Sequence, residues 1–133
     1  MTSSPVTRLT DDQCWALLAR EGFGRLATSA LGVIDITPVN YAVDGRTLLL
    51  RTAPGTKLLE LTVNADVAFE IDERAPGYAW SVVLKGRARM ITDPHEIAVA
   101  ERSGLRTQIA TEKTIWVRIE PTAVSGRHFV LSS

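Results

Sequence analysis

Apolar and polar residues near the N-terminus recur at the spacing of an amphipathic helix. Thr10 followed three residues later by Gln13 is typical of a capping box, and Gly22 suits the far end of the helix. The sequence therefore predicts a helix over residues 10–21 with one face turned toward a core. The apolar positions of that face are Cys14, Trp15, Leu17 and Leu18.

The periodicity changes to that of β-strands between residues 23 and 52. Turn signals at Leu31-Gly32 and Asp44-Gly45 separate three runs, which predicts a three-stranded meander. Pro38 in the second run cannot donate a hydrogen bond to a neighbouring strand, so it indicates an edge or a bulge where a ligand meets free backbone groups. The predicted strands cover residues 23–30, 33–42 and 47–52.

The rest of the chain alternates short helices with strands. Pro76-Gly77 predicts a loop between two strands, and Asp93 before Pro94 is typical of a helix start. Apolar strands leave no long edge exposed, so we expect six or seven mostly antiparallel strands closed into a barrel with three short helices. The remaining helices are predicted at residues 56–63 and 94–103, and the remaining strands at 66–71, 79–91, 114–119 and 124–131.

Length and composition indicate one globular domain. With 133 residues, 45% of them hydrophobic, we predict a single domain over 1–133 whose first nine residues are flexible. Lys plus Arg and Asp plus Glu both number 15, so no overall field favours nucleic acid or an anionic membrane. No run approaches the roughly 20 apolar residues of a membrane span. Since Cys14 is the one cysteine and pairs with no other, we expect a cytoplasmic protein.

The segment from the third predicted strand into the following helix carries the most informative chemistry. Arg51 ends the strand, Lys57 begins the helix, and between them lie a glycine and the hydroxyls of Thr52 and Thr56. A phosphate requires such converging donors, to which the helix N-terminus adds free N–H groups. The same residues also suit a solvent-exposed turn, and because the spacing of a P-loop is absent, the residues alone leave both interpretations open.

Five segments of the chain carry a family resemblance. They are Gly24-Arg25-Leu26-Ala27, Pro38-Val39-Asn40-Tyr41, Asp44-Gly45, Leu50-Arg51-Thr52-Ala53-Pro54-Gly55-Thr56-Lys57-Leu58 and Trp80-Ser81-Val82-Val83-Leu84-Lys85-Gly86-Arg87-Ala88. In order and spacing, from about residue 10 to residue 129, they resemble the pyridoxamine 5'-phosphate oxidase-like family of FMN-binding split β-barrels.

The resemblance implies an antiparallel split barrel, mainly β with short helices (α+β), that binds FMN at the interface of a homodimer. The cofactor-binding residues that it implies are Arg51, Thr52, Thr56 and Lys57 at the phosphate, Pro38, Val39 and Asn40 along the ring, Trp80, Ser81 and Val82 at its polar edge, and Trp116 and Arg118 from the second subunit.

The implied function is that of a flavin-dependent oxidoreductase acting on a small organic molecule. A flavin carries the redox chemistry itself, so the lack of a catalytic dyad or triad does not argue against an enzyme, and no catalytic residue is assigned. The chain lacks the paired basic and aromatic C-terminal pattern that holds substrate in true pyridoxamine phosphate oxidases. This departure argues against vitamin B6 as the substrate.

Two alternatives stay open. A deazaflavin-dependent reductase would need a basic groove for the longer anionic tail of its coenzyme, and Arg87, Arg89 and Arg106 are candidates for it. A non-catalytic protein that binds flavin or haem is the other, with His95 and His128 as the two possible axial histidines. Two histidines and one cysteine argue against a zinc site.

Overall fold

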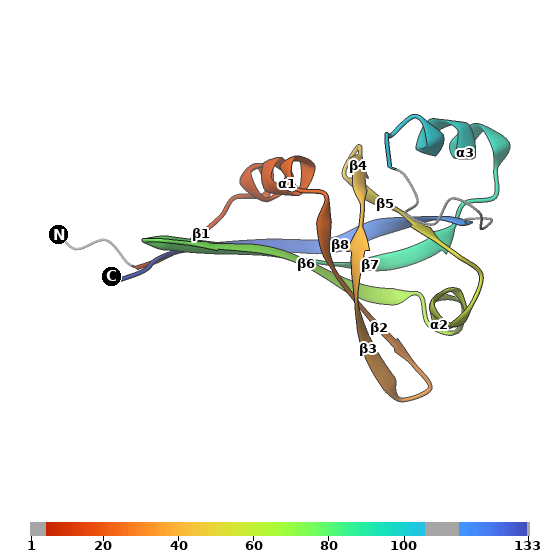
Figure 1. Ribbon diagram of the computed structural model, residues 1–133, viewed down its shortest axis with the longest axis horizontal. Coiled ribbons are helices and arrows are strands. Elements are labelled where there is room, and N and C mark those ends of the chain that lie inside the picture. The colour runs from red at the N-terminus through yellow and green to blue at the C-terminus, as the bar shows by residue number, and fades with distance from the viewer. Residues whose placement is uncertain (1–4, 106–114, 133) are drawn as a thin grey trace.

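The computed structural model is a curled antiparallel sheet with short helices packed against it (Figure 1), which confirms the predicted fold class. The structure describes residues 5–105 and 115–132. In this part of the chain the strands pair in the order β3-β2-β6-β7-β8-β5-β4, and β1 pairs with β8. The elements are β1 (Val6–Arg8), α1 (Asp11–Arg20), β2 (Phe23–Ala30), β3 (Val33–Asn40), β4 (Ala42–Asp44), β5 (Thr47–Thr52), α2 (Thr56–Val63), β6 (Asp66–Ala75), β7 (Tyr78–Met90), α3 (Pro94–Glu101) and β8 (Ile115–Val130).

Side chains cap two of the helices as the sequence predicts. In the capping box of α1, the Gln13 backbone N–H donates to Thr10 Oγ1 and the Thr10 backbone N–H donates to Gln13 Oε1. Asp93 accepts a hydrogen bond from the Glu96 N–H at 2.9 Å and starts α3, which ends at Glu101 and so is shorter than predicted. These local signals place helix starts because each cap satisfies N–H groups of the first turn.

The predicted three-stranded meander is wrong. β3 pairs with β2 alone, whereas β5 pairs with β4 and β8, so β3 and β4 lie at opposite ends of the strand order. The predicted second strand divides at Tyr41, whose buried hydroxyl donates to the Leu18 carbonyl oxygen at 2.6 Å. The chain therefore turns away from β2 at this residue. Pro38 lies on the edge strand β3, in agreement with its missing donor.

The C-terminal strands are continuous where the sequence predicts two. β8 runs as one strand, and a register shift opposite Lys85 and Gly86 places the extra residue Thr122 in a bulge. The described part of the chain contains eight strands, more than the six or seven predicted. One of them, β1, lies within the first nine residues, which the sequence predicts to be flexible, and pairs with the far end of β8. β8 thus contacts β1, β5 and β7.

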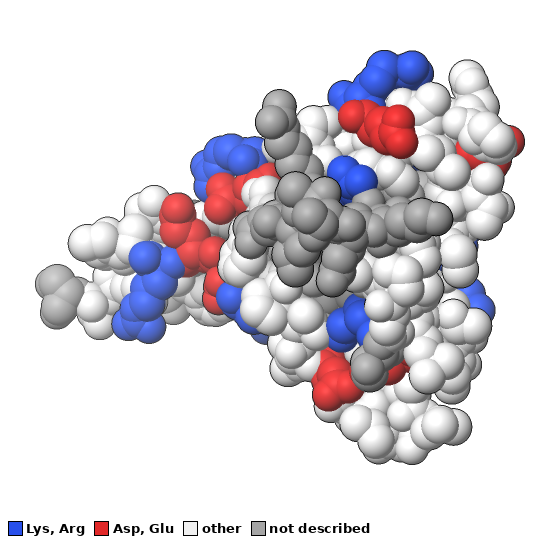
Figure 2. All heavy atoms as spheres, turned by 45° about the vertical axis from the view of Figure 1, so that its right-hand side comes forward, with Lys and Arg blue, Asp and Glu red and all other residues white. Residues whose placement is uncertain are grey.

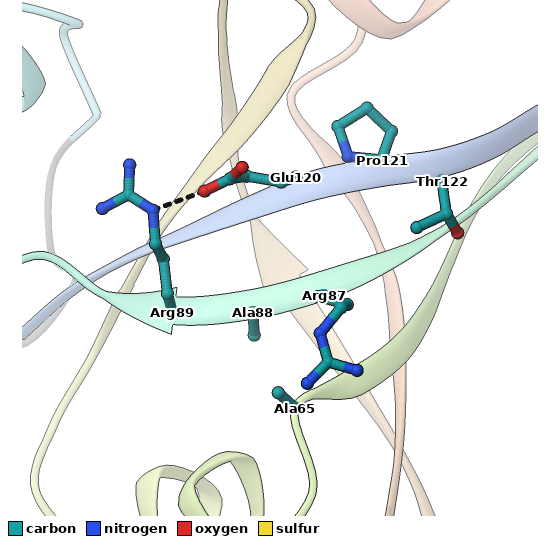
Figure 3. Close-up of a pocket in the computed structure, with 7 residues that line it drawn as sticks. All are labelled: Ala65, Arg87, Ala88, Arg89, Glu120, Pro121 and Thr122. Carbon is teal, nitrogen blue, oxygen red and sulfur yellow. Dashed lines mark hydrogen bonds and ion pairs between the residues drawn. The ribbon is translucent and has the colours of Figure 1, made fainter.

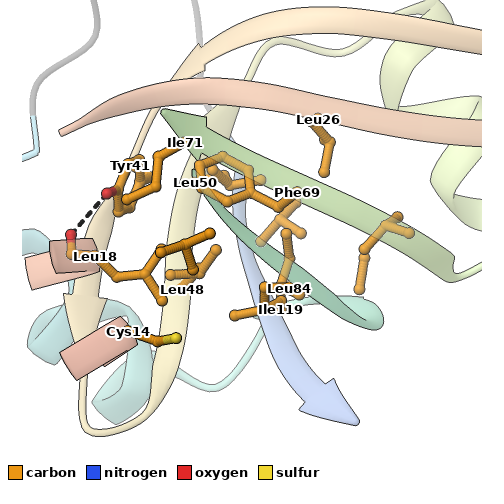
Figure 4. Packing of buried hydrophobic residues seen from close by; sticks show 14 of the residues in the cluster. Cys14, Leu18, Leu26, Tyr41, Leu48, Leu50, Phe69, Ile71, Leu84 and Ile119 are labelled. Atoms are coloured by element: carbon orange, nitrogen blue, oxygen red, sulfur yellow. Dashed lines mark hydrogen bonds between the residues drawn. The ribbon is translucent and has the colours of Figure 1, made fainter. Parts of the chain in front are cut away.

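Two clusters of buried apolar residues hold the sheet and helices together. The larger one fills the inside of the curled sheet, where Tyr41 and Phe69 meet edge to face at a centroid distance of 4.8 Å (Figure 4). The smaller one lies on the opposite face of β5 and β8, under α3. Its buried members are Leu49, Ile91, Ala100 and Trp116.

Candidate functional site

The junction between β5 and α2 has an open helix N-terminus. Its N-cap is Gly55, with φ 154° and ψ −156°. Residues other than glycine strongly disfavour this backbone conformation. Within the described part of the chain, no side chain caps α2, and its first turn contains no acidic residue, in contrast to α1 and α3. The first-turn N–H groups of α2 are therefore not claimed by a capping side chain of the described residues, and no acidic residue of that turn offsets the partial positive charge of the helix end.

Lys57 in the first turn of α2 contacts a carboxylate of its own helix. Its Nζ lies 3.7 Å from Glu60 Oε2, and the two side chains are only 20% and 14% exposed. Glu60 also accepts a hydrogen bond of 2.6 Å from the hydroxyl of Thr28 on β2. That hydrogen bond, together with contacts to Asp35 and Lys57, lowers the pKa of Glu60. α2 is thereby held against the β2–β3 hairpin.

Arg51 and Thr52 lie at the end of β5. The Arg51 guanidinium lies over the ring of Trp116, its partner on β8, at 4.7 Å from the ring centroid. The Thr52 hydroxyl donates to the Ala53 carbonyl oxygen at 3.3 Å. The side chain of Thr56 lies outside the described part of the structure. The structure thus places Arg51, Thr52 and Lys57 at one strand-to-helix junction, as predicted.

Arg118 is part of an internal ion-pair network. Its side chain is 9% exposed, and it donates to Glu96 at 2.8 Å, to Asp44 at 3.0 Å and to the Thr47 hydroxyl at 2.6 Å. Arg89 donates to the same Glu96 carboxylate, and hydrogen bonds from Arg89 and then Arg118 lower the pKa of Glu96 to about 2. This network fastens α3 to β4, β5, β7 and β8.

The remaining predicted residues lie elsewhere on the sheet. Pro38, Val39 and Asn40 are on edge strand β3, and the ladder through β2 and β6 brings Pro38 level with Val83 of β7. Trp80 is buried, and its indole N–H donates to Glu73 at 3.1 Å. Ser81 and Val82 follow it on β7.

Within one chain, Trp80 and the β5–α2 junction are widely separated. Trp80 pairs with His128 on β8, whereas Arg51 pairs with Trp116. The twelve intervening steps correspond to roughly 40 Å along the strand. Figure 1 shows β8 extending the length of the sheet between the two regions. One chain therefore does not bring the predicted polar-edge residues to the predicted phosphate residues.

A pocket of about 430 Å³ opens beside the bulge of β8 (Figure 3). Both of its arginines are paired with carboxylates: Arg87 with Asp66 at 2.7 Å, and Arg89 with Glu120 and Glu96. The basic groove expected for a deazaflavin tail is thus charge-compensated at these two positions, while Arg106 lies outside the described residues. The lining residues are Ala65, Arg87, Ala88, Arg89, Glu120, Pro121 and Thr122.

The surface carries both signs of charge. On the face shown in Figure 2, basic and acidic side chains lie beside one another. Among the described residues, no helix is long and apolar enough to cross a membrane, and no three His, Cys, Asp or Glu side chains gather as a metal site. His128 stacks on Tyr78 at a centroid distance of 5.8 Å, and His95 is exposed near the start of α3.

Sequence reasoning missed Glu60 and Asp35, which interact with Lys57, and Thr28, which donates to Glu60. The one signal within the sequence is the three-residue spacing of Lys57 and Glu60, which places them side by side on a helix. Thr28 and Asp35 are directly paired on the β2–β3 hairpin, and nothing in their spacing along the sequence predicts that this hairpin meets α2.

Comparisons with known proteins extend over nearly the whole chain. The family model described as pyridoxamine 5'-phosphate oxidase matches residues 10–128. An uncharacterized protein of Mycobacterium tuberculosis is 42% identical over 87 residues, which are 65% of this chain and 79% of that protein.

Two solved structures are similar in both sequence and fold. One, from Corynebacterium glutamicum, is named as a candidate pyridoxamine 5'-phosphate oxidase; it is 37% identical with a TM-score of 0.92, over 100% of this chain and 99% of that one. The other is the FAD binding protein from Mycobacterium smegmatis, 40% identical with a TM-score of 0.84, over 95% of this chain and 100% of that one.

Proposed function

The chain belongs to the pyridoxamine 5'-phosphate oxidase family of flavin-binding split barrels, and from this premise we propose that it binds FMN and acts as an oxidoreductase on a small organic molecule. The observation that carries the proposal is the β5–α2 junction. There, an open helix N-terminus follows Gly55, and the chain carries Arg51 four residues before this glycine and Lys57 two residues after it.

The donor chemistry of this junction fits a flavin phosphate. A phosphate monoester carries close to two negative charges at neutral pH, which matches two basic side chains and the positive end of a helix dipole. A side chain at Gly55 would require a strained backbone, so glycine suits a loop whose N–H groups approach an anion. When bound, the flavin supplies the hydride chemistry, while the protein binds and orients it.

FAD is the second candidate cofactor, because the 40% identical protein from Mycobacterium smegmatis is a FAD binding protein. FMN and FAD share riboflavin and the phosphate on its ribityl chain, so the β5–α2 junction would serve either. They differ in the adenylate portion, which only FAD carries. Comparing the affinities of FMN, FAD and riboflavin therefore separates the contribution of the first phosphate from that of the adenylate.

We further propose that the protein is a homodimer with the flavin at the subunit interface. A flavin that contacts both the β5–α2 junction and Trp80 to Val82 needs two chains, because one chain holds these regions far apart along β8. The β2–β3 hairpin supplies an apolar surface for such contact, and an apolar pocket of about 260 Å³ lies beside it. The apolar residues of the hairpin that are more than half exposed are Phe23, Leu31, Val33, Ile34 and Ile36.

Flavin titration of the purified protein tests the cofactor proposal. We expect FMN to be bound by the wild-type protein and lost from the double variant Arg51→Ala with Lys57→Ala. The matched control Lys85→Ala removes an exposed lysine from β7 and should keep FMN. Flavin binding that is unchanged in the double variant would refute the phosphate site. Binding of the deazaflavin coenzyme in preference to FMN would refute the choice of cofactor.

Light scattering at several protein concentrations tests the dimer. We expect a dimeric mass for the wild-type protein and a shift toward monomer for Ile34→Lys, because this exposed apolar side chain lies on the hairpin surface. A monomeric mass for wild-type protein with FMN bound would contradict the proposal.

A further inference from the structure

Four polar side chains meet between α2 and the β2–β3 hairpin, next to the proposed phosphate site. Glu60 accepts a hydrogen bond from the buried Thr28 hydroxyl at 2.6 Å, and its Oε2 lies 3.7 Å from Lys57 Nζ. Asp35 is the cross-strand partner of Thr28 and contacts Glu60 as well. The cation proposed to hold the flavin phosphate therefore lies beside two carboxyl groups.

The charges of this cluster decide what Lys57 offers to an anion. With both carboxyls ionised, Lys57, Asp35 and Glu60 sum to one negative charge, which opposes a phosphate. With one proton on the carboxyl pair, the cluster is neutral, and Lys57 attracts a phosphate without a net opposing charge nearby. The Glu60 side chain is only 14% exposed, so its interaction with Lys57 is less screened than that of a fully exposed ion pair.

We propose that Asp35 and Glu60 hold one proton between them when a flavin phosphate occupies the β5–α2 junction, so that cofactor binding takes up a proton. The proposal rests on the proposed flavin site. Asp35 and Glu60 act through Lys57, so they are positioning residues. The proton comes from solvent and resides on a carboxyl oxygen of the pair.

The ionisation of the two carboxyls agrees with this arrangement. The hydrogen bond and negative charge of Glu60 raise the pKa of Asp35, whereas the Thr28 hydroxyl lowers that of Glu60, so the proton belongs on Asp35. Among the described residues, Lys57 on α2 and Thr28 on β2 are the other groups that act on the pair. A phosphate dianion raises the pKa of Asp35 further, so FMN affinity falls as pH rises through the pKa of Asp35.

FMN titrations between about pH 5 and about pH 9 compare wild-type protein with Asp35→Asn, which keeps the shape of Asp35 and carries no charge. The phosphate of FMN itself ionises near pH 6. Because this ionisation affects both proteins alike, we compare the dissociation constants of wild type and Asp35→Asn as a ratio at each pH. We expect that ratio, wild type over Asp35→Asn, to rise across the range, because the wild-type protein loses affinity as Asp35 ionises and the variant does not. Riboflavin lacks the phosphate and should show a constant ratio.

Calorimetry in buffers of different ionisation enthalpy counts the proton directly. We expect uptake on FMN binding by wild-type protein beyond that of Asp35→Asn under the same conditions. Glu60→Gln is a second variant, which can still accept the hydrogen bond from Thr28 but carries no charge. We expect its proton uptake on FMN binding to be reduced in the same way. Circular dichroism establishes that each variant is folded.

The outcomes separate this proposal from the proposed function. If FMN binds more tightly than riboflavin and needs Lys57, but the wild-type to Asp35→Asn ratio is independent of pH, the proton proposal is overturned and the phosphate site stands. If FMN and riboflavin bind equally and Lys57→Ala has no effect, both are overturned.

Discussion

Replacing Arg118 by methionine should destabilise the protein by removing the centre of the α3 network. Arg118 is 9% exposed and donates to Glu96, Asp44 and Thr47. Methionine keeps much of the volume of the arginine stem and removes all three donors. The variant therefore isolates the loss of charge and hydrogen bonds from the loss of packing.

The size of the effect follows from what each partner retains. Breaking a buried ion pair by removing one member costs about 3–5 kcal/mol when the other charge is left unpaired. Glu96 keeps two hydrogen bonds from Arg89, at 2.7 and 3.0 Å, and Asp44 is 41% exposed and returns to water. We therefore expect a smaller loss, about 2 kcal/mol of unfolding free energy.

Urea denaturation at two pH values measures this loss and its cause. The pKa of Glu96 is lowered from 4.5 to about 2, so its carboxylate stabilises the fold fully above the unfolded value. That contribution disappears as pH falls from about 4.5 toward about 2. The difference between wild type and Arg118→Met should thus be full near pH 7 and smaller near pH 3.

Two results would refute this account of Arg118. One is a difference in stability below about 0.5 kcal/mol at neutral pH, the level of an ordinary surface substitution. The other is a difference in unfolding free energy that is as large near pH 3 as near pH 7, which would show that the loss does not come from the interaction with Glu96. The prediction that Arg118 also contacts the flavin of a partner subunit is tested on the same variant, by its FMN affinity under conditions where it is folded.

Three further substitutions have expected costs that the structure sets. Gly126→Ala places a Cβ 2.7 Å from Cys14 Sγ, so overpacking should cost about 1–3 kcal/mol in urea denaturation. Asp93→Ala removes the side chain that caps α3 and should cost about 1 kcal/mol by the same assay; a loss of zero would contradict the cap. Tyr41→Phe leaves the Leu18 carbonyl without its 2.6 Å hydrogen bond and should lower the unfolding free energy by about 1 kcal/mol, visible as a reduced Tm.

Features that depend on neighbouring residues were predictable from the sequence. The caps at Thr10 and Asp93 and the hairpin turns at Leu31-Gly32 and Pro76-Gly77 each follow from side chains or backbone angles within a few residues. Gly32 and Gly77 have φ values of 79° and 88°, which explains glycine at both turns.

Strand pairing between distant segments was not predictable in this way. The periodicity of residues 33–42 is that of a strand throughout, but the hydrogen bond from Tyr41 to Leu18 belongs to tertiary structure. It divides the segment and sends β4 and β5 to the other side of the sheet. Similarly, residues 120–123 look like a break between two strands, and only their pairing with β7 shows a bulge in one strand.

The same distinction between local and tertiary features applies to the candidate site. Arg51 and Lys57 were found because one strand-to-helix junction holds both, whereas Asp35 reaches Lys57 only through the β2–β3 hairpin. A basic residue at a helix start attracts an anion less strongly when a carboxylate beside it compensates its charge. Lys57 has Glu60 beside it, and Arg87 and Arg89 have carboxylates as well. What distinguishes Lys57 is that one of its two carboxyl neighbours, Asp35, has a raised pKa, so one proton on that pair leaves the cluster neutral and makes affinity for a phosphate depend on pH.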